Sequence, residues 1–137
     1  MIDWLGLQPN DRVLLLSIPD PFFVDELARK LASGLIVALG PEEKVRSARR
    51  AARGLENVLF VPASPDDIPW QDGFFTKAVD FVCSWENPER AAREVARVLS
   101  SGGQIYLADP ARVRQHLLAS GFHLSKTGEF VLSADVR

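Results

Sequence analysis

Residues 87–110 read NPERAAREVARVLSSGGQIYLADP and contain the clearest helix-to-strand transition in the chain. Pro88 suits the first turn of a helix, because its missing N–H would have no partner there. The apolar residues that follow recur at helical spacing, at Ala91, Ala92, Val95, Val98 and Leu99. The glycines at 102 and 103 predict the end of this helix, and residues 104–108 form an apolar run typical of a buried strand. The stretch therefore predicts an amphipathic helix that leads into a strand of a mostly parallel sheet.

The same alternation extends along most of the chain. Apolar runs predict strands at residues 12–18, 35–39, 58–61, 78–83 and 104–108, and helical patterns fall at 21–31, 41–52, 88–99 and 111–120. Strands that alternate with helices of this length indicate a parallel, twisted α/β sheet with helices on both faces. We expect a loop at residues 63–73, a closing antiparallel hairpin formed by 122–124 and 130–136, and one domain over residues 1–137.

Composition excludes several classes of protein. The 137 residues carry a formal net charge of −2, which argues against nucleic acid as the main partner. No apolar run approaches the ~20 residues that span a membrane, and the amino terminus lacks the features of a signal peptide. The single cysteine, Cys83, fits a reducing compartment, so we expect a cytoplasmic protein with no membrane association.

Four stretches carry a resemblance to a known family: residues 5–16 (LGLQPNDRVLLL), 54–75 (GLENVLFVPASPDDIPWQDGFF), 87–110 and 117–122 (LLASGF). Together they resemble the class I S-adenosylmethionine-dependent methyltransferases, and residues 88–103 are similar to the sequence PERALREVARVLRPGG that is typical of the small-molecule branch. The resemblance implies a Rossmann-like fold, a final antiparallel hairpin, S-adenosylmethionine as the cofactor and no metal.

The family's glycine-rich cofactor loop falls on residues 17–21, SIPDP, in this chain. By this resemblance, Ser17, Pro19 and Pro21 stand where the family has its three glycines. Leu15 stands where the family has an acidic residue in its first strand. Glycine serves in such a loop because a Cβ atom would crowd the ligand, and proline additionally removes the N–H that could be donated to it. We therefore expect this part of the cofactor site to be eroded.

The family's acidic cofactor ligands are also replaced. The acid that takes the ribose hydroxyls falls on Gly40, the acid beside the adenine falls on Ser64, and the aspartate before the fourth strand falls on Thr76. The resemblance gives these crevice positions for the cofactor: Ser17, Asp20, Gly40, Ser64, Asp66, Asp67 and Cys83. No catalytic residue and no metal-ligand spacing can be assigned.

Several of these residues have two interpretations. Asp66 or Asp67 could reach the adenine edge, or belong to a solvated loop or a helix cap, and Asp20 could bind a cation or cap the following helix. Cys83 is expected to be a buried, inert thiol. Trp70 and Trp85 could clamp a flat ligand or cover the mouth of an emptied crevice.

Two hypotheses on function remain open at this point, and they leave the enzyme class undecided. One is a non-catalytic member of the family that binds a protein partner, a second copy of itself as a homodimer, or another small molecule. The other is an active methyltransferase of a small molecule with an atypical cofactor site. The first predicts that Pro19 and Pro21 draw the loop across the cofactor space and leave a shallow or closed pocket.

Overall fold

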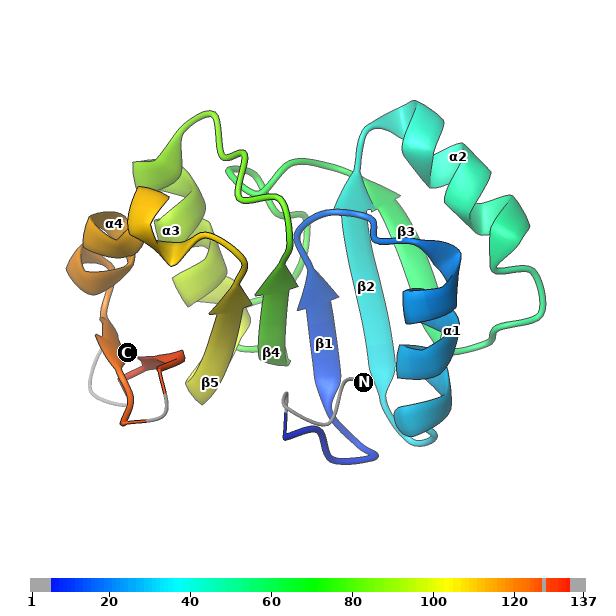
Figure 1. Ribbon diagram of the computed structural model, residues 1–137, viewed down its shortest axis with the longest axis horizontal. Helices are drawn as coiled ribbons and strands as arrows, with labels where there is room; N and C mark the ends of the chain where they lie inside the picture. Colours follow the sequence, from blue (N-terminus) through cyan, green and yellow to red (C-terminus); the bar gives the residue numbers. More distant parts are fainter. Residues whose placement is uncertain (1–5, 127, 134–137) are drawn as a thin grey trace.

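The computed structural model describes residues 6–126 and 128–133, which form a seven-stranded sheet with helices on both faces (Figure 1). The strands are β1 (Arg12–Leu15), β2 (Leu35–Gly40), β3 (Val58–Pro62), β4 (Phe75–Asp80), β5 (Leu99–Leu107), β6 (Phe122–Leu124) and β7 (Phe130–Leu132). The helices are α1 (Pro21–Lys30), α2 (Glu42–Ala51), α3 (Pro88–Val98) and α4 (Arg114–Ala119), with a short 3-10 helix at Pro110–Arg112.

The strand order is β3-β2-β1-β4-β5-β7-β6. Strands β1 to β5 pair in parallel, whereas β7 pairs antiparallel with both β5 and β6. This arrangement confirms the predicted Rossmann-like α/β fold with its antiparallel hairpin. The predicted hairpin residues 134–136, and residue 127 in its turn, lie outside the described residues.

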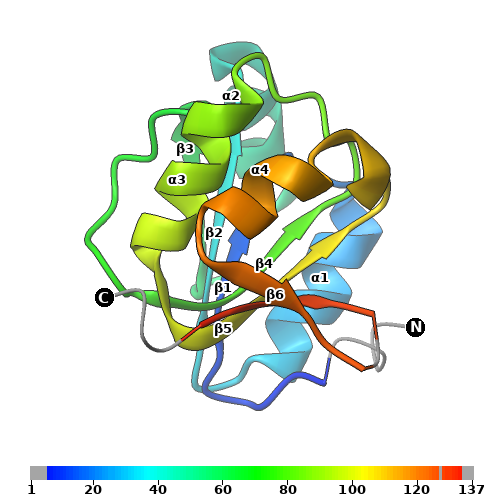
Figure 2. The ribbon, with the colours of Figure 1, turned by 90° about the vertical axis from the view of Figure 1, so that its left-hand side faces the viewer.

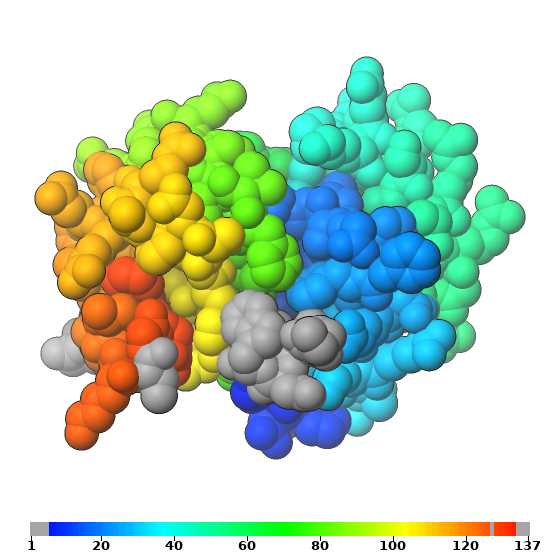
Figure 3. Space-filling model, viewed as in Figure 1, coloured from blue at the N-terminus to red at the C-terminus, as the bar shows by residue number. Residues whose placement is uncertain are grey.

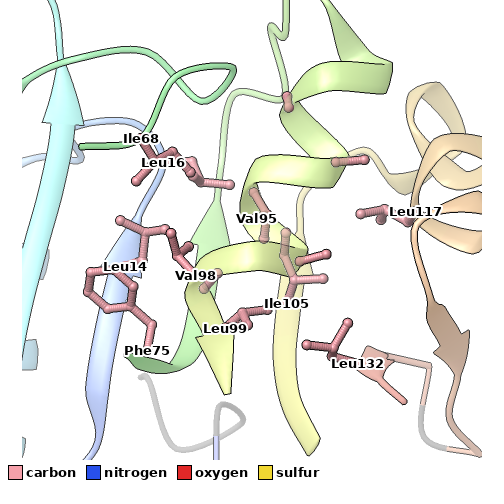
Figure 4. Close-up of a cluster of buried hydrophobic side chains, with 14 of the residues drawn as sticks. Leu14, Leu16, Ile68, Phe75, Val95, Val98, Leu99, Ile105, Leu117 and Leu132 are labelled. Atoms are coloured by element: carbon pink, nitrogen blue, oxygen red, sulfur yellow. The ribbon is translucent and has the colours of Figure 1, made fainter. Parts of the chain in front are cut away.

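The sheet is apolar on both faces because side chains alternate along each strand. Val13 and Leu15 of β1 belong to a core cluster that contains Val24 and Leu27 of α1. Leu14 belongs instead to the cluster on the opposite face, which contains residues of α3, α4 and the hairpin (Figure 4). Figure 2 shows α1 and α3 on opposite sides of the sheet. The continuous apolar run of the first strand is thus explained by burial on two sides.

Three strands and one helix differ from their predicted bounds by several residues. β1 ends at Leu15 rather than at residue 18, and the helix predicted at 111–120 is a 3-10 turn at Pro110–Arg112 followed by α4. β4 ends at Asp80 rather than at residue 83, because the carboxylate of Asp80 accepts the backbone N–H groups of Val82 and Cys83 and turns the chain. Cys83 completes this turn with a φ of 56°. β5 begins at Leu99, directly after α3, and the predicted helix terminator Gly102 lies inside the strand with a φ of 80°. The pairing of β4 with β5 shifts register here, between Phe75 and Lys77.

The predicted loop at 63–73 contains no helix or strand, only an isolated bridge between Ser64 and Asp67. Arg97 of α3 holds this loop by donating to the carbonyl oxygens of Ile68 and Trp70 at 2.7 and 2.8 Å. The same guanidinium pairs with Glu94 at 2.9 Å and with Asp72 at 2.7 Å. One side chain on α3 therefore fixes the path of the chain between β3 and β4.

Candidate functional site

The carboxyl ends of β1, β2, β3 and β4 surround an open cleft with a volume of about 440 Å³. It lies where the strand order reverses between β1 and β4, which is the position at which open α/β sheets bind ligands. In Figure 3 the molecule is hollowed along its upper edge, between the residues after β4 (green) and the start of α2 (cyan). The first loop therefore does not close the pocket, so that part of the prediction is wrong.

Four of the predicted crevice residues contribute to the wall of this cleft. Ser17 follows β1, Gly40 ends β2, and Ser64 and Asp66 follow β3. The hydroxyl of Ser64 donates to the carboxylate of Asp66, so these two side chains form one polar group. The cleft volume lies within the range of ~300–1,000 Å³ that is usual for small-molecule sites.

The other three predicted residues do not line the cleft. Asp20 caps α1, where its Oδ1 accepts the backbone N–H of Phe23 at 3.0 Å, so the capping interpretation holds. Asp67 is exposed, and its backbone N–H donates to the carbonyl of Ser64 at 3.1 Å. Cys83 is buried within the loop after β4, and burial raises the pKa of its thiol, as expected for an inert cysteine.

The two tryptophans do not form a clamp. Trp85 lines the cleft and is 6% exposed, whereas Trp70, within the 63–73 loop, packs against Phe74 and Phe75. Neither tryptophan is an exposed residue. The homodimer itself stays a prediction.

Asp80 is the residue that the sequence analysis missed. Its side chain is buried, and its Oδ1 accepts the Ser17 hydroxyl at 3.2 Å and the N–H groups of Val82 and Cys83 at 2.9 and 3.0 Å. Its Oδ2 accepts the indole N–H of Trp85 at 2.6 Å. All of these partners are donors, so both oxygens of the Asp80 carboxylate serve as acceptors. The signal in the sequence was an acidic residue within an otherwise apolar run. Because the strand was predicted to extend to residue 83, Asp80 was placed inside it and not at its end.

Ile18 and Gly40 meet at the same end of the sheet. A Cβ atom on Gly40 would lie 2.7 Å from Cδ1 and 3.0 Å from Cγ1 of Ile18. The isoleucine side chain of the first loop therefore fills the space that any larger residue at position 40 would need. Pro19 and Pro21, on either side of Asp20, offer no backbone N–H to the cleft.

No group of three or more His, Cys, Asp or Glu side chains among residues 6–126 and 128–133 could hold a metal ion. None of the helices in the described part of the chain is long and apolar enough to cross a membrane.

Comparison with known proteins identifies the family. The model of the family described as "Methyltransferase domain" matches residues 22–107, more than half of the chain. A curated protein of Bacillus subtilis (strain 168), "Putative methyltransferase YrhH", is 33% identical over 112 residues, which cover 79% of this chain and 62% of that protein. The chain therefore belongs to the S-adenosylmethionine-dependent methyltransferase family. It spans less than two thirds of YrhH.

Solved structures agree with this fold. A SAM-dependent methyltransferase from Aquifex aeolicus superimposes with a TM-score of 0.81 at 18% identity, covering 95% of this chain and 85% of that chain. The YcgJ protein from Bacillus subtilis gives a TM-score of 0.77 at 19% identity, covering 90% and 66% of the two chains. At these identities the likeness shows the fold.

Proposed function

We propose that this member of the methyltransferase family binds a small molecule in the cleft between β1 and β4 and does not catalyse transfer from S-adenosylmethionine. The observation that carries the proposal is the contact of Ile18 with Gly40. In the family, the resemblance places the ribose-binding acid at position 40. Here position 40 is a glycine, and the space beside it is occupied by the side chain of Ile18.

The energetic consequence for the usual cofactor is large. A hydrogen bond to a carboxylate contributes roughly 1.5–3 kcal/mol, so each lost acid weakens binding by about 10- to 100-fold. Ser64 replaces the second acid, and Pro19 and Pro21 remove two possible backbone donors. The family match supports this reading of the first loop, because it begins at Phe22, directly after that loop.

The cleft residues therefore fit S-adenosylmethionine in volume but not in the polar contacts that would hold its ribose. The open cleft and the carboxylate of Asp66 favour the alternative, an active methyltransferase whose cofactor site has been rebuilt. In that alternative, Asp66 would accept from the nucleoside in place of Ser64. The affinity for the cofactor separates the two functions.

Calorimetric titration with S-adenosylmethionine and S-adenosylhomocysteine tests the proposal. We expect dissociation constants of about 1 mM or weaker for both ligands, against ~10 μM for a working enzyme. An Asp66→Asn variant titrated in parallel reports whether any residual binding uses that carboxylate. Micromolar binding that depends on Asp66 would overturn the proposal and establish the rebuilt site.

A further inference from the structure

An exposed phenylalanine stands beside an apolar pocket on the outer surface of α1 and α2, away from the cleft of the proposed function. We infer that two copies of this chain associate through that surface as a symmetric dimer, in which Phe22 of each copy enters the pocket of the other. Three features carry the inference: the exposed ring, the pocket next to it, and two opposite charges at the pocket's edge.

Phe22 has the most exposed large apolar side chain in the described part of the chain, at 87%. It lies in the first turn of α1, whose buried residues are Val24, Leu27 and Ala28, so the helix directs Phe22 to solvent. The next residue behaves differently, because the ring of Phe23 packs edge-on against Phe81 at 5.1 Å. One exposed apolar side chain is ordinary by itself. The pocket beside it gives Phe22 its significance.

The pocket has a volume of about 110 Å³ and lies between α1, α2 and β3. Both helices pack on one face of the sheet, toward its β3 edge (Figure 1). Pro21, Val24, Ala48, Ala51 and Phe60 contribute to its wall, and the short alanine side chains of α2 leave the space. An apolar cavity of ~150 Å³ takes up benzene. This pocket opens to the surface, so it can take most of a phenyl ring.

The ring and the pocket adjoin, because Pro21 lines the pocket and Phe22 follows it. With 87% of its surface exposed, Phe22 does not fill the pocket of its own chain. A twofold axis places a surface opposite its own copy, so each ring can meet the other chain's pocket in a contact that closes. A ring and a pocket on distant faces would instead join copies into an open chain.

The pocket's edge carries one charge of each sign. Asp25, three residues after Phe22, and Arg53, just after α2, both line the pocket. Asp25 pairs with Arg29 of its own helix at 3.0 Å and keeps 44% of its side chain exposed. Within the described ranges the guanidinium of Arg53 forms no ion pair. The helix that inserts Phe22 brings its Asp25 toward the other copy's Arg53, and the twofold axis repeats this pair. Such pairs fix orientation more than they add affinity.

Sedimentation equilibrium of the full chain measures the association. Stable interfaces bury roughly 1,200–2,000 Å², and one ring with one charge pair per copy covers less, so we expect a weak dimer with a dissociation constant of about 50–500 μM. Samples from ~20 μM to ~1 mM should therefore change from mostly monomer to mostly dimer. A single chain at every concentration would overturn the inference, whether the pocket stays empty or takes a small molecule instead.

Two substitutions at exposed positions remove the contact from either side. Phe22→Ser takes away the ring, and Ala51→Leu fills the pocket from its edge. We expect each to weaken the dimer at least about tenfold, because apolar burial supplies most of its affinity. Leu118→Ser is the control, since Leu118 is 45% exposed on α4 and does not line the pocket. Equal effects of Phe22→Ser and Leu118→Ser would overturn the inference.

A charge exchange tests the twofold arrangement. Asp25→Arg alone and Arg53→Glu alone should each weaken the dimer at least about fivefold at low ionic strength, because both pairs across the axis become repulsive. An equimolar mixture of the two variants should associate within about threefold of wild type, because both pairs again join opposite charges. Damage confined to the fold of either variant would not be repaired by mixing. A mixture that associates no better than the separate variants would overturn the symmetric contact.

Discussion

Cδ1 of Ile18 lies 2.7 Å from the position that a Cβ atom on Gly40 would take, so a side chain at position 40 would displace the end of the Ile18 side chain. Either Ile18 changes its rotamer to admit that side chain, or a smaller residue at position 18 leaves room for it. By the family resemblance, position 40 is also where the ribose-binding acid stands. Substitutions at this contact can therefore be tested by the free energy of unfolding and by the affinity for the cofactor.

Gly40→Asp should lower the free energy of unfolding by about 1–3 kcal/mol, because the new side chain is forced against Ile18. Ile18→Ala/Gly40→Asp should recover at least half of that loss, because the alanine opens the space. Urea denaturation of the wild type, both single variants and the double variant gives the coupling free energy. Ile18→Ala alone is the control for lost apolar contact. Additive effects of the two substitutions would contradict the contact.

Asp80→Asn should destabilise the fold by about 2–3 kcal/mol, because one amide cannot accept from the donors on both oxygens of the present carboxylate. The side-chain NH₂ group would face either the indole of Trp85 or the two backbone N–H groups. Denaturation followed by tryptophan fluorescence measures the loss.

The matched control for Asp80→Asn is Asp67→Asn, which makes the same chemical change at an exposed position. We expect its effect to stay within about 0.5 kcal/mol. If both variants are equally stable, Asp80 does not organise the loop after β4.

The contact of Ile18 with Gly40 and the hydrogen bonds of Asp80 also show which features the sequence could predict and which it could not. The alternation of strands and helices followed from apolar runs and their spacing, because each element buries its own side chains. β4 ends at Asp80, whose carboxylate accepts the N–H groups of Val82 and Cys83. The same carboxylate also meets Ser17, which lies 63 positions earlier in the chain, and no local pattern reports that meeting. Gly102 was interpreted as the residue that ends the helix. It lies instead within β5, because residues 99–107 pair with β4.

The candidate site was predictable in position and not in shape. The carboxyl ends of parallel strands meet at one edge, so Ser17, Gly40, Ser64 and Asp66 could be placed there from their order alone. The open cleft was not predicted, because the restriction of φ at Pro19 and Pro21 does not reveal the direction in which the loop leaves the sheet.

The stability of the 63–73 loop should depend on pH through Glu94. The hydrogen bond from Arg97 is the main cause that holds the pKa of Glu94 below its ordinary value. A carboxyl with a lowered pKa in the folded state stabilises above its unfolded pKa, near ~4.3, and this contribution is lost as pH falls through the folded pKa. Wild type should therefore exceed Glu94→Gln in stability by about 1 kcal/mol at neutral pH.

The difference between wild type and Glu94→Gln should shrink below about pH 4, as Glu94 takes up its proton. Denaturation curves collected from acid to neutral pH measure it. Glu89→Gln is the control, since Glu89 is exposed and its contact with Arg93 is long, at 4.0 Å. A difference between wild type and Glu94→Gln that does not change with pH would contradict the role of the charge.

Thermal unfolding in the presence of S-adenosylmethionine gives the last prediction. With a dissociation constant near ~1 mM, ligand at ~1 mM adds only about 0.4 kcal/mol to the free energy of unfolding, a rise of about one or two degrees in Tm. A site that bound at ~10 μM would add about 2.7 kcal/mol and raise Tm by roughly 10 °C. We expect the small shift for wild type. Ile18→Ala/Gly40→Asp should show a larger shift, because it restores a carboxylate at position 40 and opens the space beside it. A wild-type shift above about 5 °C would instead identify this chain as a cofactor-binding methyltransferase with a rebuilt site.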